Sequence, residues 1–103
     1  MDKLDQRAFE ELVEEEEQSC LVLFSRKSCH VCQAIHPILE GLEAEFPDFP
    51  FYQVDVEEQP ALFQHVGGKG VPQVLYFAHG ETSARLVGEH TEDEYAELIE
   101  QLS

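Results

Sequence analysis

Cys29 and Cys32, separated by two residues, are the side chains of this sequence best suited to chemistry. They fall between the apolar run 20–24, which predicts a buried strand, and a long segment with helical periodicity. Free amides and the helix dipole at a helix N-terminus favour an anion, so a thiol there loses its proton more easily. We therefore expect an exposed Cys29 to attack a partner's disulfide. Cys32, shielded one turn into the helix, should then attack the mixed disulfide and release the partner.

Basic residues beside the motif support this reading. Arg26 and Lys27 immediately precede Cys29, and Lys69 lies in a glycine-rich loop of a chain with six basic residues. Local cations stabilise a thiolate, and His30 would add to this effect when protonated. The alternative is that Arg26, Lys27 and His30 are ordinary solvated residues.

A Cys-x-x-Cys pair can also be half of a zinc site. His36, four residues after Cys32 on the same helix face, could be a third ligand, or it could be a surface residue. The sequence has no second Cys-x-x-Cys or His pair to complete the site, so we predict neither a metal nor another cofactor. Cys20 is expected to pack as a small hydrophobic residue.

Hydrophobic periodicity places these residues in an α/β domain. The order is helix, strand, helix, strand, helix, strand, strand, helix. The helix that begins at Cys29 has an apolar stripe of Val31, Ile35, Ile38, Leu39, Leu42 and Phe46. Strands are predicted at 20–24, 51–56, 73–77 and 84–87, and the last helix at 91–102. We expect a central four-stranded mixed sheet with helices on both faces, its first two strands parallel and its last two antiparallel.

Length and charge limit the classes of function. The 103 residues suit a single domain over 1–103. Twenty-two acidic residues against six basic ones give a net charge of −16, which disfavours nucleic acid or an anionic membrane as a partner. No apolar run approaches the roughly 20 residues of a membrane span, and the N-terminus does not resemble a signal peptide. We expect a cytoplasmic monomer.

The chain resembles the thioredoxin family from residue 20 to 102. The resemblance rests on Cys29-x-x-Cys32 after a strand, Pro37 in the helix, Val71-Pro72 at the start of a strand, and Gly88 before the last helix. It implies a thioredoxin-like fold and a thiol–disulfide oxidoreductase that reduces protein disulfides, recharged by a dithiol reductase or glutathione. It also implies that Pro72 is cis and lies against the cysteine pair, and that Val71 offers backbone groups to an extended bound peptide.

The sequence departs from the family's pattern at several positions. The family's usual Trp-Cys-Gly-Pro-Cys is replaced by the run from Ser28 to Cys32, with His30 and Val31 as the intervening residues that tune redox poise. The family's buried aspartate corresponds to Leu23, and its lysine partner to Gln53. These departures leave a second function open: a thioredoxin-fold binding or adaptor module without turnover.

Overall fold

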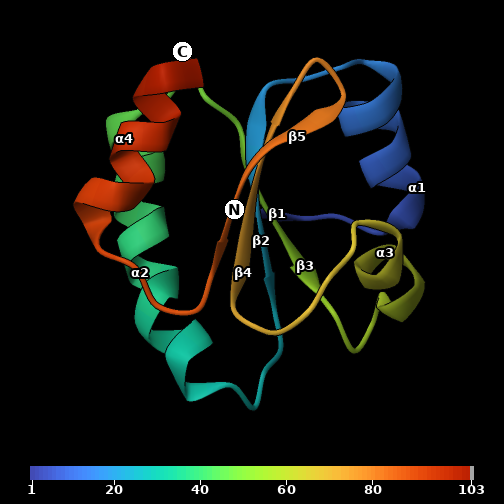
Figure 1. Ribbon diagram of the computed structural model, residues 1–103, viewed down its shortest axis with the longest axis horizontal. Helices are drawn as coiled ribbons and strands as arrows, with labels where there is room; N and C mark the ends of the chain where they lie inside the picture. Colours follow the sequence, from blue (N-terminus) through green and yellow to red (C-terminus); the bar gives the residue numbers. More distant parts are fainter. Residues whose placement is uncertain (103) are drawn as a thin grey trace.

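The structure is a computed structural model that describes residues 1–102. Its elements follow the order expected from the sequence, with additions near the N-terminus (Figure 1). The strands are β1 (Asp2–Lys3), β2 (Cys20–Ser25), β3 (Phe51–Asp55), β4 (Gln73–Ala78) and β5 (Glu81–Val87). The helices are α1 (Gln6–Phe9), continued by the wider π-helical segment η1 (Glu10–Glu15), then α2 (His30–Glu45), α3 (Pro60–His65) and α4 (Glu92–Leu102).

The strands form one mixed sheet in the order β1-β3-β2-β4-β5. β2 and β3 are parallel, and β4 pairs antiparallel with both β2 and β5, as predicted. The prediction of four strands was wrong, because β1 adds a fifth strand parallel to β3 at the edge. Its residues Asp2 and Lys3 are both exposed. A two-residue edge strand has no alternation of buried and exposed positions, so its sequence carries no strand signal.

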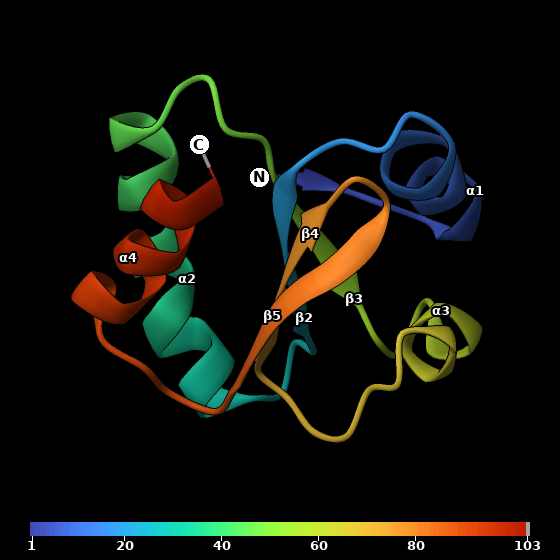
Figure 2. The same ribbon diagram turned by 45° about the horizontal axis from the view of Figure 1, so that its top comes forward.

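Helices cover both faces of the sheet, which confirms the predicted α/β class. Figures 1 and 2 show α2 and α4 on one face, with α1 and α3 on the other. Each face has its own core: Leu21 and Leu23 of β2 join the cluster under α2 and α4, whereas Val22 and Phe24 join the opposite cluster. The predicted strand buried on both faces is therefore confirmed, and it holds the start of α2 at one end of a rigid sheet.

The apolar stripe of α2 is confirmed except at its first residue. Ile35, Leu39 and Leu42 are fully buried, but Val31 is 40% exposed. Figure 1 shows the first turn of α2 at the end of the sheet. Val31 is therefore an exposed apolar residue beside the cysteines and not part of the core.

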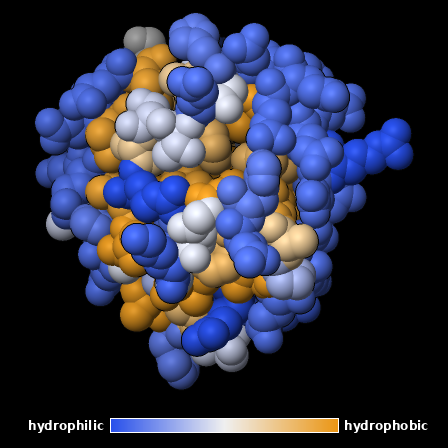
Figure 3. Space-filling view, turned by 45° about the vertical axis from the view of Figure 1, so that its right-hand side comes forward, coloured by the Kyte–Doolittle hydropathy of each residue, from blue (hydrophilic) through white to orange (hydrophobic). Residues whose placement is uncertain are grey.

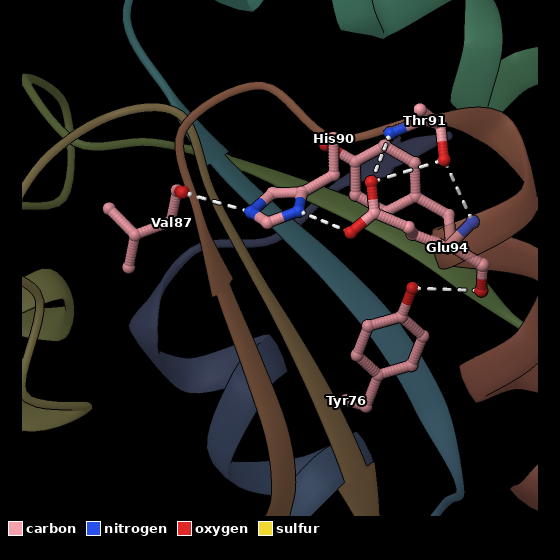
Figure 4. Close-up of polar contacts among 6 residues, drawn as sticks. Tyr76, Val87, His90, Thr91 and Glu94 are labelled. Atoms are coloured by element: carbon pink, nitrogen blue, oxygen red, sulfur yellow. Dashed lines mark hydrogen bonds and ion pairs between the residues drawn. The ribbon is translucent and has the colours of Figure 1, made fainter.

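The start of α4 is fixed by a capping box, in which a threonine and a glutamate three residues later bond each other's backbone N–H (Figure 4). The N–H of Glu94 donates to Thr91 Oγ1 at 3.2 Å, and the N–H of Thr91 donates to Glu94 Oε1 at 3.0 Å. On the buried side of the helix, Tyr76 of β4 donates its hydroxyl hydrogen to the carbonyl oxygen of Tyr95 at 3.0 Å. These contacts tie α4 to the sheet.

One face of the molecule carries hydrophilic residues around its rim, and hydrophobic residues reach the surface over its centre (Figure 3). No helix within residues 1–102 is long and apolar enough to cross a bilayer.

Candidate active site

Cys29 is the N-cap residue of α2, and its sulfur caps the helix. The backbone N–H of Cys32 donates a hydrogen bond to Cys29 Sγ at 3.1 Å. In this structure the two cysteines form a disulfide, with their Cα atoms 5.2 Å apart. The arrangement places the Cys29 sulfur at the positive end of a 16-residue helix, where an anion is stabilised.

The two cysteines differ less in exposure than expected. Cys29 is 9% exposed and Cys32 is 4% exposed. The prediction of an exposed Cys29 was wrong for this disulfide form, in which Cys29 Sγ accepts the backbone N–H of Cys32. Cys32 is shielded, as predicted.

The residues flanking the cysteines are open to solvent. Arg26 and Lys27 precede Cys29 and are exposed, and the carbonyl oxygen of Lys27 accepts a hydrogen bond from Gln33 Nε2 at 3.1 Å. His30, the first residue of α2, is exposed and so is Val31. The roles predicted for these four residues stay predictions, but their positions at the motif are established.

A pocket of about 200 Å³ opens beside Cys32. It lies between the start of α2 and the strands β1, β2 and β3. The lining residues are Lys3, Ser25, Arg26, Lys27, Cys32, Gln33, His36, Gln53 and Asp55. Lys69 is not among the described residues that line it. Lys3 adds a third cation to this pocket, and the sequence analysis missed it because it belongs to the unpredicted strand β1. The position of Lys69 relative to Cys29 stays a prediction.

The Val71-Pro72 peptide bond is cis, as the family resemblance implied. Pro72 is buried and Val71 is half-buried. Phe24 pairs with Gln73 in the sheet, so Pro72 lies at the end of the sheet from which the chain continues to Cys29 (Figure 1). Contact between Pro72 and the cysteine pair stays a prediction.

Cys20 lies apart from this site. It is fully buried at the start of β2, and burial raises the pKa of its thiol to about 12. Such a thiol stays protonated at neutral pH, which agrees with a packing role.

His36, the candidate third zinc ligand, has both ring nitrogens in contact with side-chain oxygens. Its Nδ1 lies 3.1 Å from Glu40 Oε1 and its Nε2 lies 3.3 Å from Gln53 Oε1. Within residues 1–102, no group of three or more His, Cys, Asp or Glu side chains is arranged to hold a metal ion.

The sequence model of the thioredoxin family matches residues 1–101. This chain belongs to the thioredoxin family. Family membership together with the Cys29–Cys32 pair makes the protein a thiol–disulfide oxidoreductase.

Individual relatives agree with this assignment. The chain is 31% identical to a thioredoxin of Chlamydia caviae, over 81% of each protein. It is also 31% identical to NADPH-dependent thioredoxin reductase 3 of Arabidopsis thaliana over 92% of its own length, but it spans 18% of that longer protein. The structure of Fasciola hepatica thioredoxin superimposes with a TM-score of 0.89 and 25% identity, covering all of both chains.

The family's buried acid–base pair is replaced by uncharged residues. Leu23 is fully buried in β2 and is the register partner of Gln53 in β3. Neighbouring residues in register point to the same face of a sheet, so both face α2. Gln53 donates from Nε2 to the carbonyl oxygen of Met1 at 2.6 Å and presents Oε1 to His36. Because residue 23 is a leucine, this chain has no carboxylate there that could accept a proton.

Proposed function

We propose that this protein reduces disulfide bonds of protein substrates, with Cys29 and Cys32 alternating between dithiol and disulfide. The observation that carries the proposal is the Cys29 sulfur at the N-cap of α2, where it accepts the N–H of Cys32. The same hydrogen bond and the helix dipole favour a thiolate at this position.

The cycle transfers two electrons in two exchange steps. The Cys29 thiolate attacks one sulfur of the substrate disulfide, a mixed disulfide forms, and the other substrate sulfur leaves as a thiolate. Cys32 then loses its proton and attacks Cys29 Sγ. The Cys29–Cys32 disulfide forms, the bond to the substrate breaks, and the second substrate sulfur leaves as a thiolate. Both substrate thiolates take up protons.

Substrate docking is proposed at the surface around the motif. Val31 is exposed next to Cys29 and offers an apolar contact. The backbone of Val71, before the cis Pro72, offers hydrogen-bonding groups to an extended peptide, as the family resemblance implies. An extended segment can pair with such groups as an added strand does. The net charge of −16 favours substrates with basic surfaces.

Recharging requires a donor of two electrons. We propose a dithiol reductase or glutathione as this donor and a reducing compartment, such as the cytoplasm, as the location. The support for a reductase is that a segment similar to this chain occurs within a protein named NADPH-dependent thioredoxin reductase.

A disulfide-reduction assay tests the proposal. The protein is mixed with insulin and dithiothreitol, and the precipitation of reduced insulin is followed by turbidity. We expect catalysis above the rate with dithiothreitol alone, and its loss in Cys29→Ser and in Cys32→Ser. Cys20→Ala is the matched control and should keep full activity, since Cys20 is buried away from the site.

The adaptor alternative makes the opposite predictions. An inert wild-type protein whose partner binding is the same in Cys29→Ser would contradict turnover and support a binding module. The potential of the Cys29–Cys32 couple against glutathione then separates a reductant from an oxidant.

A further inference from the structure

The second exchange step requires a group that accepts the proton of Cys32. Cys32 must become a thiolate, but it is only 4% exposed, and burial disfavours the charged form of a thiol. The strand beneath it offers Leu23, which cannot accept a proton. The proton acceptor for Cys32 must therefore be a residue outside β2.

His36 is the residue of suitable chemistry in the pocket beside Cys32. It lies four residues further along α2, so the two side chains are neighbours on one helix face. Both line the pocket of about 200 Å³. Histidine is the side chain that gains and loses a proton near neutral pH. The pocket has room for a water molecule, and proton transfer through one water is an accepted geometry for a general base.

Both nitrogens of the His36 ring lie within hydrogen-bonding distance of a side-chain oxygen. Gln53 donates from its nitrogen to Met1, so its oxygen must face His36 Nε2. The other ring nitrogen faces the carboxylate of Glu40. Both ring nitrogens therefore face oxygen atoms, and only the doubly protonated ring can donate to both. A proton taken from Cys32 completes this set of hydrogen bonds.

We propose that His36 accepts the proton of Cys32 during resolution, in place of the carboxylate that Leu23 does not supply. This inference rests on the proposed disulfide-reduction cycle. The Cys32 thiol gives its proton to the neutral imidazole through one water in the pocket, and the Cys32 thiolate attacks Cys29 Sγ. The substrate leaves as a thiolate, and the imidazolium returns its proton to solvent or to that thiolate. Gln53 acts as a positioning residue that holds the ring.

Charged groups from every neighbouring element act on this step. Those around the pocket and His36 are Lys3 of β1, Arg26 and Lys27 before α2, Glu40 of α2, and Asp55 of β3. The three cations favour the Cys32 thiolate once it forms, and the Glu40 carboxylate lies 3.1 Å from His36 Nδ1.

Asp55 is the rival proton acceptor, because it lines the same pocket. Its Oδ1 already accepts the backbone N–H groups of Glu57 at 2.8 Å and Glu58 at 3.3 Å. That oxygen is therefore already engaged in the turn that follows β3. The Asp55→Asn variant in the experiment below separates the two candidate acceptors.

The experiment isolates the resolution step. Reduced protein is mixed with a disulfide-linked peptide, samples are quenched in acid at set times, and mass spectrometry follows the mixed disulfide. Its formation depends on peptide concentration, whereas its decay does not. We expect His36→Gln to leave formation unchanged and to slow the decay by about 10- to 100-fold at pH 7. The loss should shrink as the pH rises, because hydroxide can then take the proton of Cys32 without the help of His36.

Controls separate this role from others. His65→Gln removes another histidine that contacts a carboxylate, on α3, and should decay like the wild type. A loss in His36→Gln that is equal at all pH values, an unchanged decay, or the same loss in Asp55→Asn would overturn the assignment to His36. Failure of the wild type to form any mixed disulfide would overturn the proposed cycle as well.

Discussion

The backbone N–H of Cys32 points at the sulfur of Cys29 across 3.1 Å, so the sulfur of one cysteine caps the helix that contains the other. A thiolate is a better acceptor of that hydrogen bond than a thiol. The hydrogen bond therefore favours the thiolate form of Cys29, which is the nucleophile of the proposed cycle.

The first prediction concerns the acidity of Cys29. In a Cys32→Ser variant, alkylation by iodoacetamide should have its midpoint below pH 8.5, the approximate value of a free thiol. Replacing Arg26 and Lys27 together by alanine should raise the midpoint by about half a unit, the scale of an exposed charge pair. Arg7→Ala is the control, because Arg7 lies on α1, on the opposite face of the sheet from α2. Distant acidic charges matter less, since salt screens them within roughly 8 Å.

An unshifted midpoint in the Cys32→Ser variant would contradict an activated nucleophile. An equal rise in Arg7→Ala would show that total charge, and not the cations beside the motif, sets the reactivity.

The second prediction is that Cys20 is inert in the folded protein. It is fully buried, and burial raises its pKa to about 12, so almost none of it is thiolate at pH 8. Mass spectrometry after alkylation of the reduced protein should show modification at the other two cysteines, with Cys20 modified only in denaturant. Rapid labelling of Cys20 under native conditions would mean that β2 opens far more readily than its central position suggests.

Much of this molecule could be predicted from local sequence, because β2 and α2 carry strong periodic signals. The parallel β2–β3 pairing and the position of Cys29 and Cys32 at the start of α2 both followed from such signals. Lys3 and Gln53 could not be assigned to the pocket from the sequence. They come to line it beside Cys32 only because strands far apart in the sequence pair with each other. His36 was recognised as sharing a helix face with Cys32, but its partners on β3 and the pocket were needed to give it a function.

The third prediction links pH to the start of α4, where Glu94 meets Thr91 and His90 (Figure 4). The backbone N–H of Thr91, the His90 ring and the Thr91 hydroxyl lower the pKa of Glu94 from 4.5 to about 2. Its contribution to stability is therefore present above pH 4.5 and is lost as the pH falls toward 2. The hydrogen bond to Glu94 raises the pKa of His90 above 6.5. The His90 contribution is present below pH 6.5 and is lost as the pH rises through the raised pKa.

Urea unfolding at several pH values measures both effects. Glu94→Gln should flatten the decline between pH 4.5 and 2, and His90→Gln should flatten the decline above pH 6.5. Thr91→Ala should lower the free energy of unfolding by about 1 kcal/mol at neutral pH, the usual cost of losing an N-cap side chain. If the pH dependence of Glu94→Gln matches that of the wild type, the contacts around Glu94 do not affect folding.

The last prediction restores a carboxylate beneath the cysteines with Leu23→Asp. Leu23 is fully buried in the core under α2 and α4, so the change removes apolar contacts and buries an acid. It should lower the free energy of unfolding by about 3 kcal/mol or more. Circular dichroism should show a fall in Tm of roughly 15 °C, and kinetics are measured well below that temperature.

The kinetic outcome of Leu23→Asp depends on His36. A buried carboxyl group has a raised pKa and so becomes a competent proton acceptor for Cys32. With His36 present, the decay of the mixed disulfide should change less than about twofold, because a base is already in place. In the His36→Gln background, Leu23→Asp should recover most of the lost rate, whereas Leu23→Asn, which has the same size but takes up no proton, should recover none. A large acceleration by Leu23→Asp in the presence of His36 would mean that resolution lacks a base, and His36 would then not be the group that receives the proton.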